Sequence, residues 1–392
     1  MKKIPLIIPL IFLVQCVSGD YENAERVISL NTDNISEIDL NEITNKIEFL
    51  KLTTEDEVFI GDLTSVEITK NRIYTLDTFN SQGLYVFDRK GLPIFTIAEL
   101  GEGPGEFTGP SAFAIDNSSD QIILYDAGSN KLIFFDKENL EFVNEERLNF
   151  FPETFSVTES NYLFYMNNIP NNYSSNILIT DKNFNIIDTD LPINENMQGY
   201  HFYYPFNFTN NNDYIYFFAP SDYFIYNSDN DENTFSKYIE VDFGDQALPS
   251  SFFRKHSDNR SRLDEIGESA YNISSFFETD SFIFFAYKVG ERTFHYYFES
   301  KKSGKVIHTE HSKLNASEMA GPLPWWPIAA RNNTLIWHQQ PMVLQNYLNT
   351  KKNSYSEEDW EAYKYRNRDL INFSQAITDE DNPYLIFMKI DF

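Results

Sequence analysis

The feature that constrains the fold most is an internal repeat of paired apolar stretches. In the first copy, Ile73–Asp77 and Gly83–Asp88 are apolar runs that each end in an aspartate, with a polar turn between them. Ile123–Asp126 and Lys131–Asp136 repeat this pattern about 48 residues later. Two short apolar runs joined by a polar turn predict a β-hairpin. The chain therefore reads as a series of similar strand-rich units.

Four further copies follow the first two. They are marked by Asn176–Asp181, Tyr214–Asn227, Phe282–Phe298 and Thr334–Trp337. A period of about 40–50 residues with several short strands per unit is typical of β-propeller blades, which bury both faces of each sheet against their neighbours. Runs such as Phe282–Phe285 lack alternation, as strands buried on both sides do. We predict an all-β, six-bladed β-propeller; a β-sandwich, which needs no fixed period, is the alternative.

The two ends of the chain supply the strands that would close the ring. The N-terminal strand Lys46–Leu52 precedes the first full copy, and Asn382–Ile390 ends the chain. We expect both in the last blade, where they would latch the ring and cover exposed edges. Ser250–Gly267 and Ser354–Ile377 break the strand pattern, and the second has helical apolar spacing with acidic residues in its first turn. We expect two short helical insertions there.

A glycine-rich loop, Gly101–Phe107 (GEGPGEF), lies between the first two copies. Phosphate-binding loops lie between a strand and a helix and carry Lys and Ser or Thr, whereas this loop has two glutamates and no helical pattern after it. We predict a crossover between blades. Its glycines would allow positive φ, Pro104 would turn the chain, and Phe107 would fill the core between blades. Contact with a ligand stays open as an additional role.

The N-terminus has the pattern of a secretion signal. Lys2 and Lys3 precede the apolar stretch Ile4–Val14, which is too short to span a bilayer. The tetrapeptide that ends at Cys16, LVQC, resembles the lipobox of bacterial lipoproteins, which implies cleavage before Cys16 and lipidation of its thiol. Cys16 is the one cysteine of the chain. An ordinary secretory signal with an incidental cysteine is the alternative.

These observations predict a division of the chain and a location. We expect a signal peptide at 1–15, an acidic tether at 16–45 and the propeller at 46–392. The net charge of −28 disfavours nucleic acid as a partner and direct adhesion to an anionic membrane. The membrane contact would then come from the lipid alone. The expected location is the outer membrane, with the propeller facing the periplasm or the cell surface.

Several segments together resemble a known family. They are Ser65–Ile68, Arg72–Asp77, Leu84–Gly91, Gly101–Phe107 and the closing Asp381–Ile390. They resemble the opening blade and the terminal strand of the six-bladed β-propeller lipoproteins of Bacteroidetes-type bacteria, a group similar to NHL-repeat propellers. The resemblance covers nearly the whole mature chain. It implies a fold and a location, and it brings no catalytic residues with it.

Two aromatic loops are the best candidates for a binding site. Gly199–Pro205 and Gly321–Pro327 both precede predicted inner strands, so they would line one face of the central channel. Flat aromatic faces stack on sugars or hold peptide side chains. The candidate residues are Tyr203, Tyr204, Trp325 and Trp326, with His201 or Arg331 as polar partners. The alternative is that these aromatic side chains cap the core between blades.

No local motif indicates catalysis. The chain lacks H-E-x-x-H, a cysteine cluster and G-x-S-x-G, so we predict no metal site and no resident cofactor. The acidic stretch Ser228–Glu232 does not complete an EF-hand and reads as a solvated turn. We predict a non-catalytic binding or scaffold module for a glycan, a peptide or a partner protein. The alternative is a propeller hydrolase or lyase whose channel site, with a Ca²⁺ ion, is assembled from several blades.

Overall fold

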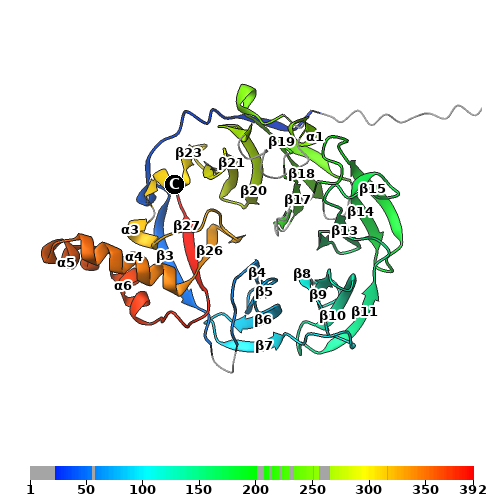
Figure 1. The fold of residues 1–392 in the computed structure, drawn as a ribbon, viewed down its shortest axis with the longest axis horizontal. Coiled ribbons are helices and arrows are strands. Elements are labelled where there is room, and N and C mark those ends of the chain that lie inside the picture. The colour runs from blue at the N-terminus through cyan, green and yellow to red at the C-terminus, as the bar shows by residue number, and fades with distance from the viewer. Residues whose placement is uncertain are drawn as a thin grey trace, which may run out of the picture.

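Six antiparallel sheets stand around a common axis in the computed structural model of the chain (Figure 1). It describes residues 23–54, 58–200, 207–211, 213–220, 222–229, 234–249, 251–255, 265–315 and 317–392. Each sheet is one blade, with its first strand at the central channel and its last strand along the perimeter of the ring (Figure 1). The prediction of an all-β, six-bladed propeller is confirmed.

The first three blades follow one another without interruption. Their strands are β4 (Ser65–Ile68), β5 (Arg72–Asp77), β6 (Gly83–Asp88) and β7 (Pro93–Ile97); β8 (Pro110–Asp116), β9 (Gln121–Asp126), β10 (Lys131–Asp136) and β11 (Phe142–Arg147); and β12 (Thr154–Val157), β13 (Asn161–Tyr165), β14 (Ser175–Asp181) and β15 (Ile186–Pro192). The repeat found in the sequence corresponds to the second and third strands of each blade. These strands are almost wholly buried, because both faces of the sheet pack against neighbouring blades.

Blades 4 and 5 have the same order of strands. They consist of β16 (Phe208–Asn210), β17 (Tyr214–Phe218), β18 (Phe224–Asp229) and β19 (Ser236–Asp242), and of β20 (Ala270–Glu278), β21 (Phe282–Val289), β22 (Thr293–Ser300) and β23 (Val306–Glu310). Aromatic rings fill the space between these blades. The ring centroids of Tyr216 in β17 and Phe276 in β20 lie 5.0 Å apart.

Blade 6 joins the two ends of the chain. Its strand order is β25 (Ala329–Arg331), β26 (Thr334–Gln339), β27 (Tyr384–Ile390) and β3 (Thr44–Lys51). The antiparallel pairing of β27 and β3 runs from Tyr384 opposite Lys51 to Ile390 opposite Thr44. The last blade thus contains the N-terminal and C-terminal strands, and the backbone hydrogen bonds between them close the ring.

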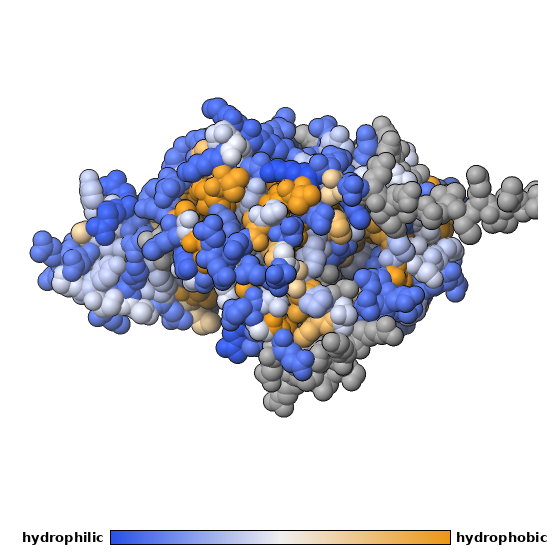
Figure 2. All heavy atoms as spheres, turned by 90° about the horizontal axis from the view of Figure 1, so that it is seen from above, coloured by the Kyte–Doolittle hydropathy of each residue, from blue (hydrophilic) through white to orange (hydrophobic). Residues whose placement is uncertain are grey.

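Residues 23–43 form a strap along the outside of the ring. β1 (Arg26–Ser29) adds a fifth, parallel strand to blade 4, and β2 (Ile38–Asp39) pairs with β24 (Leu314–Asn315). The short 3₁₀ turn η1 (Leu40–Glu42) then leads into β3. The sequence analysis places these residues in a tether, whereas in the structure they run past blades 4 and 5 to blade 6 (Figure 1). Figure 2 views the ring from this edge and shows apolar patches between hydrophilic residues.

The helices are unevenly distributed. The short elements are η3 (Gly244–Gln246), α1 (Ser251–Lys255), η4 (His311–Lys313) and α3 (Ser317–Ala320); the long insertion contains α4 (Pro341–Ser354), α5 (Glu357–Arg366) and α6 (Arg368–Gln375). This insertion lies between β26 and β27 and projects from the ring at blade 6 (Figure 1).

The helical insertion is longer than the expected segment Ser354–Ile377, because it already begins with α4 at Pro341. Only Pro341, Leu344 and Leu348 of α4 are buried, and its other apolar residues, such as the exposed Met342, lie among polar ones, so its apolar period is weak. α6 anchors the insertion to the ring, and the rings of Phe373 in α6 and Phe49 in β3 stack at 5.2 Å.

The GEGPGEF loop is the crossover from blade 1 to blade 2, as predicted. Phe107 is fully buried in the core between these blades, in the same cluster as Leu76 and Phe135. Only one of the three glycines, Gly105, has a positive φ, of +80°. Gly101 instead leaves room for Glu106, because a Cβ atom there would lie 1.9 Å from Glu106 Oε2.

Candidate binding face

The connections of the ring divide between two faces. Because the strands of each blade alternate in direction, the turn between the second and third strands and the crossover into the next first strand reach the same face. We call this the connection face. The turns between the first and second strands lie at the opposite end of the channel. Loops on one face of a rigid sheet scaffold are common places for binding sites.

Large apolar side chains are exposed on the connection face. They are Phe59, Phe79, Leu100, Phe151, Tyr173, Trp325 and Met342, together with Tyr365 in α5 of the helical insertion. Each lies in a crossover or in the connection between the second and third strands of a blade. Other exposed apolar residues lie mostly on perimeter strands, and the turns on the other side of the described blades contribute Leu92 and Tyr214. Aromatic side chains of this kind are enriched in binding interfaces.

Three of these side chains come from neighbouring loops at the junction of blades 6 and 1. A Cβ atom on Gly61 would lie 2.3 Å from the Cβ of Asn80, so the loops that carry Phe59 and Phe79 touch. The Gln340 side chain donates a hydrogen bond of 2.7 Å to the Gly61 carbonyl. Gln340 directly precedes α4, so this contact holds the start of α4, which carries Met342, against the same loop. The three apolar residues therefore belong to one patch.

The two tryptophans of the Gly321–Pro327 loop lie in different environments. Trp325 is 55% exposed, stacks on Phe294 at 5.2 Å between ring centroids, and accepts a hydrogen bond from Tyr296 Oη at its backbone oxygen. Trp326 is partly buried and packs against the cores on both sides of blade 6. Trp325 is thus available to a ligand, whereas Trp326 mainly caps the core.

Arg331 does not lie with the tryptophans. It ends β25, which runs away from the connection face, and its guanidinium donates to the carbonyls of Ile68, at 3.0 Å, and Thr69 in blade 1. Its observed contacts join blades 6 and 1. The other predicted site residues, His201, Tyr203 and Tyr204, and the lipidation residue Cys16 lie outside the described residues.

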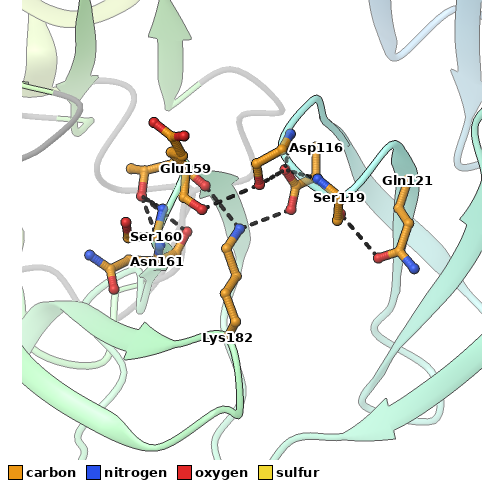
Figure 3. A network of polar contacts seen from close by, with 9 residues as sticks. Asp116, Ser119, Gln121, Glu159, Ser160, Asn161 and Lys182 are labelled. Carbon is orange, nitrogen blue, oxygen red and sulfur yellow. Dashed lines mark hydrogen bonds and ion pairs between the residues drawn. The ribbon is translucent and has the colours of Figure 1, made fainter.

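Like the Arg331 contacts between blades 6 and 1, a set of polar contacts joins blades 2 and 3 (Figure 3). It lies at the end of the channel opposite the connection face. Lys182 Nζ forms an ion pair with Asp116 Oδ2 at 2.9 Å and donates to the Thr158 carbonyl at the same distance. The hydroxyl of Ser118 donates to Asp116 Oδ1 at 2.6 Å. Burial raises the pKa of Asp116, but the contacts with Ser118 and Lys182 outweigh it and hold the pKa below its usual value. The carboxylate is fully engaged in holding two blades together.

Two scattered histidines meet inside blade 5. The hydroxyl of Tyr287 lies 2.7 Å from His308 Nε2 and 3.2 Å from His295 Nδ1. Burial, helped by the charge of His308, lowers the pKa of His295 to about 4. His295 is only 2% exposed, so this trio is a neutral hydrogen-bonded element of the core and not an accessible acid–base site.

The central channel contains a cavity of about 170 Å³ between the inner strands of all six blades. Its lining carries one ionisable side chain, Glu67. The surrounding strands desolvate this carboxyl and raise its pKa, while Arg331 opposes the shift. In the part of the chain that the structure describes, no three His, Cys, Asp or Glu side chains converge as a metal site would require.

Sequence reasoning missed Phe59, Phe79 and Phe151. Only Phe79 is a single aromatic residue between polar neighbours in a turn, Asp77-Thr-Phe-Asn-Ser81, whereas Phe59 lies between Val58 and Ile60 and Phe151 follows Phe150. A lone apolar residue in a turn was the available signal for Phe79, because a turn residue that is not needed in the core is normally polar.

Comparison with known proteins agrees with the geometry. The model of the family DUF5128, described as "6-bladed beta-propeller", matches residues 18–338. A solved "Putative exported protein" from Bacteroides fragilis is similar, with 20% identity, coverage of 93% of this chain and 99% of that chain, and a TM-score of 0.76. A member of the DUF4221 family from Bacteroides vulgatus is 10% identical, with coverage of 89% and 97% and a TM-score of 0.51.

No curated protein matches this chain in sequence. Among the described residues, no helix is both long and apolar enough to cross a bilayer. The family match spans most of the chain, and the six observed blades agree with its description. The chain belongs to the DUF5128 family of six-bladed β-propellers.

Proposed function

We propose that this propeller is a non-catalytic binding module of the cell envelope that takes its partner on the connection face. The observation that carries the proposal is the set of exposed large apolar side chains in the loops and the insertion of that face. Exposed apolar groups cost free energy in water, and their grouping on one face indicates that a partner covers them. The partner class is a glycan, a peptide or a protein.

Buried aspartates support the proposal because they hold the loops in place without a ligand. In blade 1, Asp77 accepts hydrogen bonds from the backbone N–H groups of Gly61, Phe79 and Asn80. The loops that display Phe59 and Phe79 are thereby fixed to one carboxylate. A surface that is ordered before binding loses less conformational entropy when the partner arrives.

The test measures binding of the labelled chain, without its first 16 residues, to envelopes of cells that lack the gene. The connection-face variant carries Phe59→Ser, Phe79→Ser and Met342→Ser. The matched control carries Leu92→Ser and Tyr214→Ser on the opposite side. We expect saturable binding by the wild type and the control, and at least a tenfold loss for the connection-face variant. Loss in the control alone, or equal binding by all three proteins, would contradict the proposal.

We also infer that the protein is exported and held at the outer membrane by lipid on Cys16. The lipobox-like LVQC sequence supports this inference, as does the resemblance to an exported Bacteroides protein. The chain joins the ring at Glu25, whose N–H donates to the Lys237 carbonyl in β19. Nine residues beyond Cys16 reach at most about 30 Å. The anchor would thus keep the edge of blade 4 near the membrane.

A further inference from the structure

A second feature of the connection face is an open pocket of about 540 Å³ over blade 2. Three segments build it. Glu102 comes from the GEGPGEF loop, Lys131 from the start of β10, and Arg147 and Phe151 from the end of β11 and the crossover into blade 3. Its volume falls in the range of about 300–1,000 Å³ that is typical of small-molecule sites. The exposed apolar patch at blades 6 and 1 does not include these residues.

The floor of the pocket contains a buried ammonium group. Lys131 is only 1% exposed, and its Nζ donates to Glu145 Oε2 at 2.8 Å. That interaction is the largest cause that lowers the pKa of Glu145. Among the residues that the structure describes, Glu145 is the one hydrogen-bond acceptor of Lys131, and this buried ion pair supports the pocket from below and does not face a ligand directly.

The walls combine an aromatic ring with charges of both signs. Phe151 is 63% exposed and presents the one large exposed apolar surface of the pocket. Arg147 makes a single long hydrogen bond, of 3.5 Å, to the Ser129 carbonyl. The exposed Glu102 carboxylate has no hydrogen-bond or ion-pair partner among the described residues. The pocket therefore offers a flat apolar face, a strong donor and a strong acceptor.

These walls are held in place from within the protein. The Asn130 side-chain amide donates to the carbonyls of Leu148, at 2.9 Å, and Phe150, at 3.0 Å, directly before Phe151. Asp126 accepts the backbone N–H groups of Thr108 and Gly128 on the other wall. The pocket is thus formed before any ligand enters, which reduces the entropic cost of binding.

We propose that this pocket binds a neutral saccharide ring. A sugar has an apolar C–H face that can lie on Phe151 and hydroxyl groups that both donate and accept hydrogen bonds. Hydroxyls can accept from Arg147 and donate to Glu102 at the same time. A peptide side chain of one charge would leave either Glu102 or Arg147 facing a like charge. The inference rests on the proposed function, because it names the ligand class of one part of the same face.

Saturation-transfer NMR on the chain without its first 16 residues tests the proposal. The probes are the methyl glycosides of glucose, galactose, mannose and N-acetylglucosamine and their 1→4-linked disaccharides. We expect at least one probe to receive saturation on the protons of one sugar face. Phe151→Ala should weaken its apparent affinity at least tenfold, and Arg147→Gln and Glu102→Gln should each weaken it several-fold. Equal melting temperatures would show that the variants are folded.

Phe95→Ala is the matched control, because Phe95 is also an exposed phenylalanine, 41%, but lies on the perimeter strand β7 and outside the pocket. It should bind saccharide as the wild type does. The proposal is overturned if no probe receives saturation, if Phe151→Ala binds as well as the wild type, or if tripeptides bind in a Phe151-dependent way where saccharides do not. If envelope binding still depends on Phe59 and Phe79, these results refute the saccharide pocket and leave the proposed function standing.

Discussion

The backbone N–H of Gly61 donates a hydrogen bond of 2.8 Å to Oδ2 of Asp77. Gly61 belongs to the crossover from blade 6, whereas Asp77 ends the second strand of blade 1. Blade 2 repeats the relationship, since the N–H of Gly109 donates to Asp126 Oδ1 at 2.7 Å. In blades 1 and 2, the aspartate that ends the second strand therefore joins the blade to the loop that enters it.

Asp126→Asn should destabilise the protein by about 2–4 kcal/mol, because the new amide group would direct its own donors at buried N–H groups. Asp126 is fully buried. Asp136→Asn is the control. Asp136 is less buried and accepts only from Glu138 and Asn139 in its own turn, so we expect a cost below about 1 kcal/mol. Urea denaturation measures both. Equal costs would show that the contact between Asp126 and the crossover adds nothing.

Gly91→Ala should weaken the closure of the ring. Gly91 has φ of +81°, its carbonyl accepts from Thr53, and a Cβ atom there would lie 2.0 Å from the Lys51 carbonyl oxygen at the end of β3. Gly304 occupies the equivalent turn of blade 5 with φ of +69° and open space around it.

We therefore expect Gly304→Ala to cost about 1 kcal/mol through backbone strain alone. Gly91→Ala should cost about 1–3 kcal/mol more, because the backbone of β3 must move. Thermal unfolding of the two variants gives the comparison. If Gly91→Ala is no worse than Gly304→Ala, the contact between blades 6 and 1 at this turn does not contribute to stability.

The buried histidines should make stability depend on pH. Burial lowers the pKa of His295 to about 4 and also lowers that of His308. The unfolded chain, with histidine pKa values near 6.5, then takes up protons before the folded chain does. Stability should be full above about pH 6.5 and fall between pH 6.5 and 4, by up to about 3 kcal/mol for His295. Nearby Glu310 favours the charged form of His295, while Lys313 disfavours it.

His295→Asn should flatten this profile, because an amide can bond to Tyr287 without titrating. Urea midpoints at pH 7, 5.5 and 4.5 give the measurement. Asp77 and Asp116 act in a separate window, because their pKa values are lowered. Their contribution is present above about pH 4 and is lost as the pH falls through their folded-state pKa values. A variant profile as steep as that of the wild type between pH 6.5 and 4 would rule out His295 as the cause.

The ring could be predicted because the same strand pattern recurs along the sequence. Each blade buries the same second and third strands, so the strand pattern of Ile73–Asp88 recurs along the chain, although insertions make the spacing between some copies longer. The strap was not predictable, because Arg26–Ser29 pairs with a perimeter strand far along the chain and half of its residues stay exposed. Nothing in four residues of mixed polarity specifies a distant parallel partner.

The candidate site was predicted only in part. Trp325 was a candidate because its aromatic loop precedes a predicted inner strand, but its separation from Arg331 depends on the direction of a three-residue strand. The pocket over blade 2 is built from segments that are up to about 50 residues apart in the chain, Glu102 to Phe151. A local sequence pattern cannot show that such distant residues are neighbours. They become neighbours because two crossovers pack on the same blade.

Cys16→Ala should release the protein from membranes. Each acyl methylene buried in lipid contributes about 0.8 kcal/mol, so loss of the acyl chains removes the main attraction. The net charge of −28 gives the protein no compensating attraction to an anionic bilayer. We expect the wild type to incorporate labelled palmitate and sediment with membranes, and the variant to do neither and to appear in the soluble fraction. A variant that still sediments with membranes after a salt wash would show that something other than lipid on Cys16 holds the protein there.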